Sequence, residues 1–367
     1  MTSKHPSRLS AVERAAAEYR RGVPVVLHGR DGAAVALAAE QAAAPWPGRL
    51  KDWGGDAAVL ALTDARARAL NVRPSGHSVI LLKLEPWLDE IAIRELADAT
   101  TDLANPLRGP FDRLLRPPRE DERAAVQLAK LARLLPSALV APLDQDPAAF
   151  AEAHDLLAVS TEAVFGYEQA AAVALRQVAA APVPLAGAEA TRMVAFRPED
   201  GGVEHLAIIV GDPPPHQPVL TRLHSECFTG DLLGSLKCDC GQQLRGAIDI
   251  MAAEGAGVLL YLAQEGRGIG LMNKLRAYRL QAEGFDTVDA NLRLGFDADE
   301  RVFQPAAEML RQLGFTEVRL LTNNPDKVDG LAACGITVVE RVAHSFPSNT
   351  HNEFYLATKK SRSGHLL

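Results

Sequence analysis

Cysteine is scarce in this sequence, and its distribution excludes one class of protein. The chain has 4 cysteines among 367 residues, and their uneven spacing does not form a disulfide framework. Cys238 and Cys240 are separated by one residue, which is too close for two separate bridges. We therefore expect reduced thiols and a cytoplasmic location.

Long apolar runs and an excess of basic charge are also absent. No stretch reaches the roughly 20 apolar residues that cross a membrane, and the charged segment Met1–Pro6 is not followed by the apolar core of a secretory signal. The formal net charge of −7 argues against a nucleic-acid partner, which needs a basic face. A nucleotide substrate stays possible, because a triphosphate needs only a few local cations and amides.

The chain is long enough for two domains, and no repeat of fixed period occurs in it. In the first half, the pattern predicts amphipathic helices at 9–22 and 123–135 and buried strands at 23–27 and 78–83. A further helix at about 168–180 ends at the proline-rich Ala181–Pro184, where we place a boundary.

The second half alternates more regularly between buried strands and helices. We expect strands at 206–210, 258–261, 318–322 and 336–340, and helices at 241–254, 270–284, 299–313 and 325–334. Together the two halves indicate a mixed α/β fold with two domains.

Three of the cysteines, Cys227, Cys238 and Cys240, lie close together in the sequence. Thiolates are preferred zinc ligands, and a catalytic zinc takes three protein ligands and leaves the fourth position to water. The set therefore indicates one catalytic Zn²⁺ per chain. Two other interpretations stay open: buried core cysteines, or a structural zinc with His224 or Cys334 as its fourth ligand. We interpret Cys334 as a buried core cysteine rather than a metal ligand.

The cysteine segment resembles the signature of GTP cyclohydrolase II. The matching residues are Arg222–Asp231 and Cys238–Leu244, and the resemblance runs from about residue 175 to the C-terminus, including the tail segments 352–359 and 364–367. It implies an enzyme that opens the imidazole ring of GTP as the first step of riboflavin synthesis. The products would be formate, pyrophosphate and 2,5-diamino-6-ribosylamino-pyrimidinone 5′-phosphate.

The same resemblance implies cofactors, partners and substrate contacts. Mg²⁺ would accompany the triphosphate of GTP, and the protein would be a homodimer. In this first motif, the residues that match substrate contacts are Arg222, Leu223, His224, Ser225, Glu226 and Gln243.

The second motif is the glycine-rich segment Gln264–Gly270. A glycine series alone is weak evidence for dinucleotide binding, and an ordinary strand-to-helix turn is the simpler alternative. We expect a loop whose amides approach phosphate while Arg267 supplies charge. By resemblance, Glu265, Gly266 and Arg267 contact GTP.

The third motif contains Tyr278, Thr287 and Gly295–Arg301. Asp297 and Glu300 predict a helix start in the manner of a capping box. The resemblance implies that Asp299 accepts a proton, that Tyr278 donates a hydrogen bond, that Thr287 contacts substrate, and that Arg301 attacks the α-phosphate. Because guanidinium stays protonated in proteins, an electrostatic clamp is an equally physical role for Arg301.

The fourth motif, Thr322–Lys327, predicts a turn from a strand into a helix. By resemblance, Thr322 and Lys327 contact the nucleotide.

The first half resembles 3,4-dihydroxy-2-butanone 4-phosphate synthase but lacks its catalytic residues. His28–Ala34 replaces the acidic loop of that family, and Glu120–Arg123 replaces the segment whose histidine holds the metal. Asp31, Asp121 and Glu122 could not restore the several oxygen ligands that Mg²⁺ needs. We expect an inactive synthase-like scaffold at 1–171 and a cyclohydrolase domain at 172–367.

Two alternatives keep the same fold. The protein could act on another nucleotide, as in pyrimidine breakdown, or it could be a catalytically silent zinc protein that senses GTP. Turnover separates the sensor from both enzymes, because a sensor would bind GTP without releasing formate.

Overall fold

The computed structural model describes residues 8–346 and residue 362, so the predicted tail segments 352–359 and 364–367 lie outside the described residues. The chain forms two compact units, which we describe separately. The first contains Met1–Tyr167 and Met272–Glu300, and the second contains Glu168–Leu271 and Arg301–Leu367. This division differs from the predicted linear domains, because segment 272–300 belongs to the first unit.

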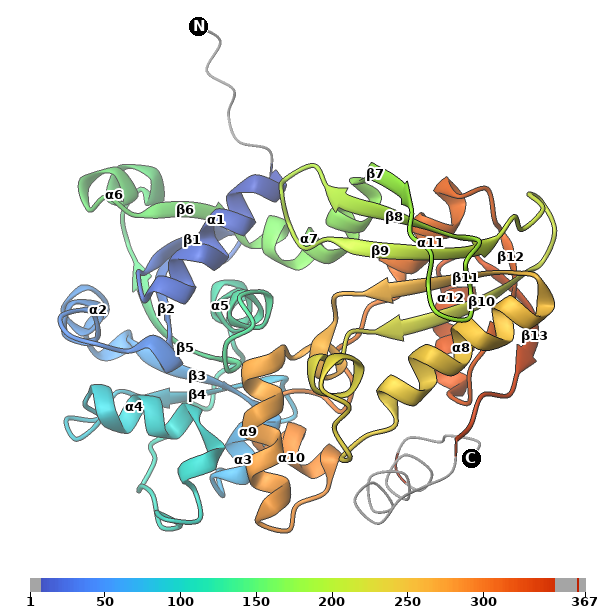
Figure 1. Ribbon diagram of the computed structural model, residues 1–367. Helices are drawn as coiled ribbons and strands as arrows, with labels where there is room; N and C mark the ends of the chain where they lie inside the picture. Colours follow the sequence, from blue (N-terminus) through green and yellow to red (C-terminus); the bar gives the residue numbers. More distant parts are fainter. Residues whose placement is uncertain (1–7, 347–361, 363–367) are drawn as a thin grey trace, which may run out of the picture. The chain divides into compact units, whose positions relative to one another are not determined.

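The first unit is built on a six-stranded mixed sheet with the order β4-β3-β5-β2-β1-β6 (Figure 1). Its strands are β1 (Val25–Gly29), β2 (Gly32–Ala38), β3 (Val59–Thr63), β4 (Val79–Lys83), β5 (Ser137–Leu143) and β6 (Leu157–Ser160). Two helices, α1 (Arg8–Arg21) and α5 (Glu120–Leu131), pack their apolar faces on this sheet. Many of the contacts are made by alanine, whose small side chain allows α5 to approach the strands closely.

Further helices complete the first unit. They are α2 (Trp46–Gly54), α3 (Asp64–Ala69), α4 (Glu90–Ala97), α6 (Pro147–Ala153), α7 (Thr161–Val173), which ends in the second unit, α9 (Leu271–Ala282) and α10 (Thr287–Arg293). Helix α10 lies beside α3, so segments far apart in the sequence share one surface (Figure 1).

The second unit contains a seven-stranded sheet with the order β13-β12-β10-β11-β9-β8-β7. The four strands β10 (Val219–Ser225), β11 (Ala256–Leu262), β12 (Glu317–Leu321) and β13 (Thr337–Val342) are parallel. The strands β7 (Leu175–Pro182), β8 (Thr191–Pro198) and β9 (His205–Gly211) extend the sheet in antiparallel fashion.

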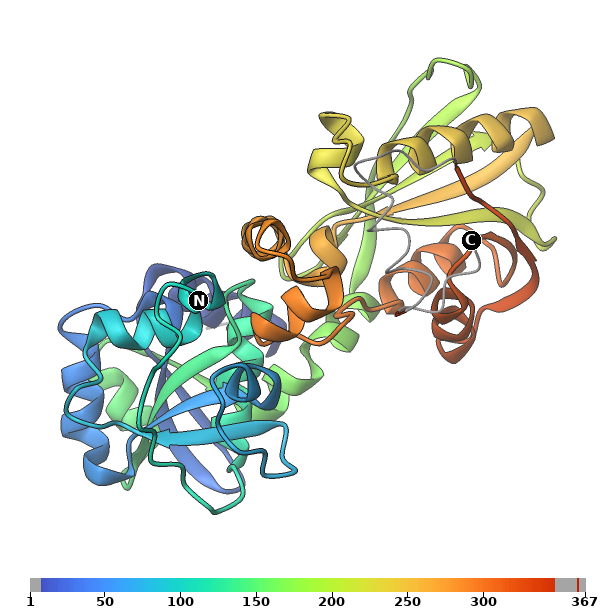
Figure 2. The ribbon, with the colours of Figure 1, turned by 90° about the horizontal axis from the view of Figure 1, so that it is seen from below.

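Helices cover both faces of this sheet (Figure 2). Helix α8 (Cys240–Glu254) packs on one face, while α11 (Gln304–Gln312) and α12 (Pro325–Ala333) pack on the other. Strand β11, which follows β10 in the sequence, pairs with one edge of β10, and the later strand β12 pairs with its other edge. The strand order therefore reverses beside β10, and ligands of open α/β sheets bind at the carboxyl ends of strands at such a point.

The mixed α/β class and the two-domain architecture are confirmed, and two local predictions are wrong. Residues 175–182 form strand β7 and not the end of a helix, because pairing with β8 overrides the helix propensity of the alanines. The helix predicted from residue 299 begins at Gln304, where Pro305 occupies the first turn. Within the described residues, no helix is both long and apolar enough to cross a membrane.

Candidate active site

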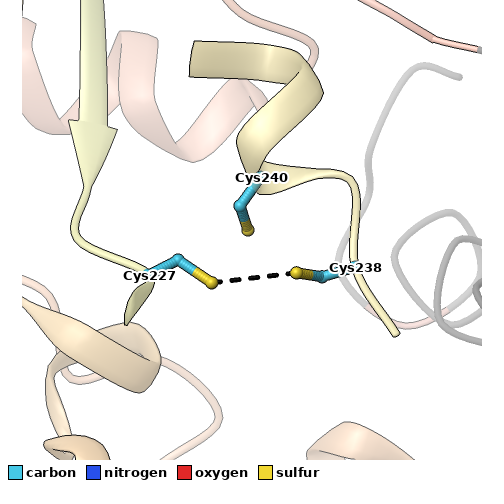
Figure 3. Close-up of side chains that lie close together, drawn as sticks. All are labelled: Cys227, Cys238 and Cys240. Carbon is cyan, nitrogen blue, oxygen red and sulfur yellow. Dashed lines mark hydrogen bonds between the residues drawn. The ribbon is translucent and has the colours of Figure 1, made fainter. Parts of the chain in front are cut away.

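Three sulfur atoms converge at the carboxyl end of β10 (Figure 3). Cys227 follows the strand, Cys238 lies on the next loop, and Cys240 is the first residue of α8. Their Sγ atoms all lie within 4.8 Å of one another, and those of Cys227 and Cys238 are 3.7 Å apart. Tetrahedral zinc with Zn–S bonds of about 2.3 Å separates its sulfurs by about 3.8 Å, so the cluster fits such an ion.

Two glycines allow the sulfurs to approach. A Cβ atom at Gly230 would lie 2.8 Å from Sγ of Cys238 and 3.0 Å from Sγ of Cys227. A Cβ atom at Gly241 would lie 2.3 Å from the carbonyl oxygen of Gly230. Gly241 is thus required for close packing against the ligand loop, and Gly230 leaves room beside the sulfurs.

The clustered thiols resist ionisation by themselves. Hydrogen bonding with Cys227, together with burial, raises the pKa of Cys238 to about 11, and hydrogen bonds with Cys227 and Cys238 raise the pKa of Cys240. A divalent cation reverses this preference, because a coordinating thiol is deprotonated. The cluster is therefore suited to a metal ion rather than to free thiolates.

The described residues supply no fourth protein ligand. The group that could hold a metal contains the three cysteines and neither His224 nor Cys334. His224 is hydrogen bonded through Nε2 to Asp231, and Cys334 packs against the core beneath α12. Three protein ligands favour a catalytic over a structural metal.

Asp231, to which the sequence pattern gave no role, organises the ligand loop. Its carboxylate accepts hydrogen bonds from the backbone nitrogen of Cys227 at 2.9 Å, from the hydroxyl of Tyr261 at 2.9 Å and from Nε2 of His224 at 3.1 Å. Tyr261 and His224 also stack, with ring centroids 5.5 Å apart. The acidic residue is visible in the sequence motif, but only the fold shows these three donors.

His224 is held as a neutral side chain. Burial lowers its pKa although Asp231 opposes this effect. With the proton on Nε2 directed at Asp231, the other ring nitrogen, Nδ1, is buried and has no partner among the described residues. This nitrogen is an acceptor available to a donor that enters the site.

Arg222 is anchored beside the cysteines by groups from two elements. Its guanidinium donates to the carbonyl oxygen of Leu321 at 2.9 Å and to Oε1 of Gln243 on α8. Burial lowers its pKa to about 10, and its Nε lacks a partner in the described part of the chain. Gln243 in turn donates to Asp239, so these polar residues form one network.

The glycine-rich segment forms a tight turn, η5 (Glu265–Gly268), after β11. Gly266 and Arg267 have φ values of 64° and 61°, a left-handed conformation that is costly for arginine. The buried carboxylate of Glu265 accepts from the backbone nitrogen of Phe228 at 2.6 Å, which ties this turn to the ligand loop.

The amides of this turn are already used. Those of Gly266, Gly268 and Gly270 donate to Glu265 or Gln264. The expectation that these three amides approach phosphate is therefore not supported, and the charge of Arg267 is the remaining candidate for a phosphate contact in this segment.

The fourth motif lies at the end of β12. Lys327 is buried and donates from Nζ to the carbonyl oxygen of Leu223 at 2.7 Å. Thr322 is buried and accepts from the amide of Asn324 at 3.0 Å. The sequence pattern missed His344, which contacts the carbonyl oxygen of Gln243 at 2.9 Å and whose backbone is bound by Asn323.

Most of the predicted residues belong to the second unit. The carboxyl halves of β10, β11 and β12, the loops after them and the helices α8 and α12 hold the cysteines with Arg222, Leu223, His224, Ser225, Glu226, Gln243, Glu265, Gly266, Arg267, Thr322 and Lys327. Arg301 is the first residue after the chain returns to this unit, whereas Tyr278, Thr287 and Asp299 belong to the first.

Arginines pair with two buried carboxylates at the start of α5 in the first unit. Asp121 and Glu122 at the start of α5 are buried, and they pair with Arg119 at 3.0 Å and Arg116 at 2.5 Å respectively. Burial raises the pKa of Asp121 despite its pairing with Arg119. Each carboxylate is thus paired with a guanidinium group, although Oδ2 of Asp121 has no hydrogen-bond partner among the described residues. The group of possible metal ligands found in the described part of the chain does not include them.

Comparisons with known proteins agree with this site. Residues 176–343 match the family model described as GTP cyclohydrolase II. GTP cyclohydrolase-2 from Azospirillum brasilense is 55% identical over 363 residues, which cover 98% of this chain and 94% of that protein. The riboflavin biosynthesis protein RibBA from Parabacteroides distasonis is 42% identical over 272 residues, which cover 72% of this chain and 67% of that protein.

One solved structure, RibBX, a two-domain 3,4-dihydroxy-2-butanone 4-phosphate synthase from A. baumannii, matches 91% of this chain and 99% of its own. Its sequence identity with this chain is 16%, and the TM-score is 0.37. The relative from Azospirillum brasilense covers nearly the whole chain at 55% identity, and on that ground the chain belongs to the GTP cyclohydrolase II family.

Proposed function

We propose that this protein is a zinc-dependent GTP cyclohydrolase II of riboflavin biosynthesis. It hydrolyses GTP to formate, pyrophosphate and 2,5-diamino-6-ribosylamino-pyrimidinone 5′-phosphate. The observation that carries the proposal is the cluster of Cys227, Cys238 and Cys240 at the carboxyl end of β10, in a chain of this family.

Zn²⁺ bound by the three thiolates would acidify a water molecule and polarise the substrate. The chain's own residues bind and orient GTP around that position. Arg222, His224 and Gln264 each present one buried polar atom without a partner among the described residues. Buried polar groups in native proteins are nearly always satisfied, so these three atoms support a polar ligand at this edge.

The roles of the remaining residues are part of the proposal. Gln243, Glu265, Gly266, Thr287 and Thr322 contact the nucleotide, as do Leu223, Ser225 and Glu226. Asp299 accepts a proton, Tyr278 donates a hydrogen bond, and Arg267, Arg301 and Lys327, with Mg²⁺, neutralise the charge of the triphosphate. Arg301 acts as an electrostatic clamp, since an arginine side chain stays protonated.

We further propose that residues 1–171 are a synthase-like scaffold without synthase activity and that residues 172–367 are the catalytic domain. The pairing of Asp121 and Glu122 with Arg119 and Arg116 supports the loss of a Mg²⁺ site. Incubation with ribulose 5-phosphate and Mg²⁺ tests this point, and formate release would contradict it. We propose a cytoplasmic location, since a reducing compartment keeps the thiolate ligands reduced. We also propose a homodimer, which light scattering tests.

The decisive experiment is a product assay with GTP, Zn²⁺ and Mg²⁺, alongside Cys238→Ser. We expect formate and pyrophosphate from the native protein and neither from the variant. A Cys334→Ser protein is the matched control, because Cys334 lies outside the cluster, and it should keep its activity. Binding of GTP without product would establish the sensor, and turnover of another nucleotide in place of GTP would redirect the substrate assignment.

A further inference from the structure

Segment 272–300 is held within the first unit by side chains that bind its backbone. The hydroxyl of Thr63 donates to the carbonyl oxygen of Gly295 at 2.8 Å, and Nη1 of Arg66 donates to that of Arg293 at 3.2 Å. A Cβ atom at Gly295 would lie 2.8 Å from the hydroxyl oxygen of Thr63, so this contact is close. The C-terminal part of the segment is thereby fixed against β3 and α3.

Ion pairs hold the other end of the segment. Arg276 on α9 pairs with Glu40 at 2.7 Å and with Asp98 at 3.2 Å. Arg276 also donates to the side chain of Asn273, which donates to the carbonyl oxygen of Arg133 at 3.0 Å. Residues from several parts of the first unit therefore contact this segment.

Lys130 contacts residues on both sides of Asp299. Its Nζ, on α5, lies 2.7 Å from Oε1 of Glu300 and 3.2 Å from Oδ2 of Asp297. The same Oε1 of Glu300 accepts from the backbone nitrogen of Asp297 at 2.7 Å. Lys130 therefore joins the two residues that enclose Ala298 and Asp299.

The surroundings of Lys130 make this contact stronger than an ordinary surface pair. The side chains of Lys130 and Glu300 are each 18% exposed. Burial by itself would lower the pKa of Lys130, but Glu300 and Asp297 outweigh it and the pKa is raised. The lysine is thus charged at neutral pH and partly shielded from solvent.

We propose that Lys130 is a positioning residue for the cyclohydrolase reaction, which fixes the turn at Asp297–Glu300 and thereby the carboxylate of Asp299. This inference rests on the proposed function, since it takes Asp299 as the proton acceptor. It assigns a use to a first unit that lacks the synthase residues. The unit supplies the surface on which a catalytic segment is ordered.

The test compares Lys130→Met with Lys83→Met in the full-length zinc protein. Lys83 also forms an ion pair in the first unit, with Asp112, away from segment 272–300. We expect kcat for formate release to fall about 10- to 100-fold in Lys130→Met, because small misplacements of a catalytic group cost this much. KM for GTP and zinc content should stay within twofold of the native values, and Lys83→Met should behave as the native protein does.

A second measurement does not depend on activity. Amide hydrogen exchange in peptides covering 295–303 should be faster in Lys130→Met and unchanged in Lys83→Met. Glu300→Gln should reproduce the effect, and the double variant should be no worse than either single change, because both act through one contact. If Lys130→Met does not fold, Glu300→Gln is the variant that tests the proposal. Lys130→Arg keeps the positive charge and should retain most of the native kcat.

If the native protein is active and Lys130→Met or Glu300→Gln shows the same turnover or the same amide exchange, the positioning role is overturned and the proposed function is not. Additive losses in the double variant would overturn it as well. A native protein that releases no formate from GTP would instead refute the proposed function, and the inference with it. The Lys83→Met control separates these cases. It releases formate if only the positioning role is refuted, and it releases none if the proposed function is refuted.

Discussion

The carboxylate of Asp231 accepts a hydrogen bond of 2.9 Å from the backbone nitrogen of Cys227. In return, the backbone nitrogen of Asp231 donates to the carbonyl oxygen of Cys227 at 2.7 Å. The two residues thus close a small ring that fixes the direction in which the first sulfur ligand leaves the strand.

Replacing Asp231 should weaken metal binding without removing a ligand. In Asp231→Asn, the loss of charge disturbs the contacts to Cys227, His224 and Tyr261 together, and we expect zinc affinity to fall about 10- to 100-fold. Competition with a chromophoric chelator measures this. Tyr261→Phe removes only one of the three contacts and should have a smaller effect, and equal affinities in all three proteins would refute the prediction.

Enlarging Gly230 should disrupt the sulfur cluster. The added methyl group of Gly230→Ala would lie within 3.0 Å of two sulfur atoms, so the loop must shift. We expect the purified variant to contain less than about a tenth of the native zinc, as metal analysis would show. In Gly166→Ala, the added methyl group has no other atom within 4 Å, so zinc should be retained. A Gly230→Ala protein that contains the native amount of zinc would contradict the prediction.

His344 should make the metal-free protein less stable in acid. Burial lowers its pKa to about 4, from an ordinary value of about 6.5. The unfolded chain therefore binds a proton first as the pH falls below about 6.5, and the histidine's contribution to stability is lost between that pH and about 4.

The size of this effect is on the order of 3 kcal/mol. Urea unfolding of metal-free native protein and of His344→Asn between pH 7 and pH 4 measures it. The native protein should lose more free energy of unfolding than the variant does. Parallel pH curves would show that the folded-state pKa of His344 is not lowered.

The buried pair of Arg66 and Asp102 should behave as one unit. Arg66 is almost fully buried and binds both carboxylate oxygens, at 2.6 Å and 2.8 Å. Because Arg66→Met leaves the buried Asp102 with the more distant Arg293, at 3.9 Å, as its ion-pair partner, we expect a loss of about 3 kcal/mol in the free energy of unfolding. Arg66→Met with Asp102→Leu should recover part of that loss, whereas additive losses in a urea titration would argue against the pairing.

The clustering of the three cysteines could be predicted from the sequence because they are close together in it. Cys227, Cys238 and Cys240 lie within one short segment, and the residues flanking them carry the family signature. The fold class followed from the alternation of strands and helices in the second half. What the sequence pattern did not predict was that Arg222 and His224 lie on a buried strand, β10, since alternating polar residues concealed it.

Interactions between distant residues could not be predicted. The donors to Asp231 include Tyr261, thirty residues away, and His344 binds Gln243 across the sheet edge. The assignment of segment 272–300 to the first unit depends on contacts such as that of Thr63 with Gly295, which no local periodicity encodes. The same limit explains β7, where pairing with β8 decides the conformation of an alanine-rich segment.

Because segment 272–300 belongs to the first unit, it also constrains the order in which the protein folds. Residues 1–167 leave the ribosome first, yet the unit they belong to is complete only when residue 300 has been made. Until then, Thr63, Arg66 and Lys130 lack their partners in that segment. Domains generally fold as units during synthesis, so here the N-terminal unit must wait for the C-terminal half, and a separately expressed fragment 1–171 would be an incomplete unit.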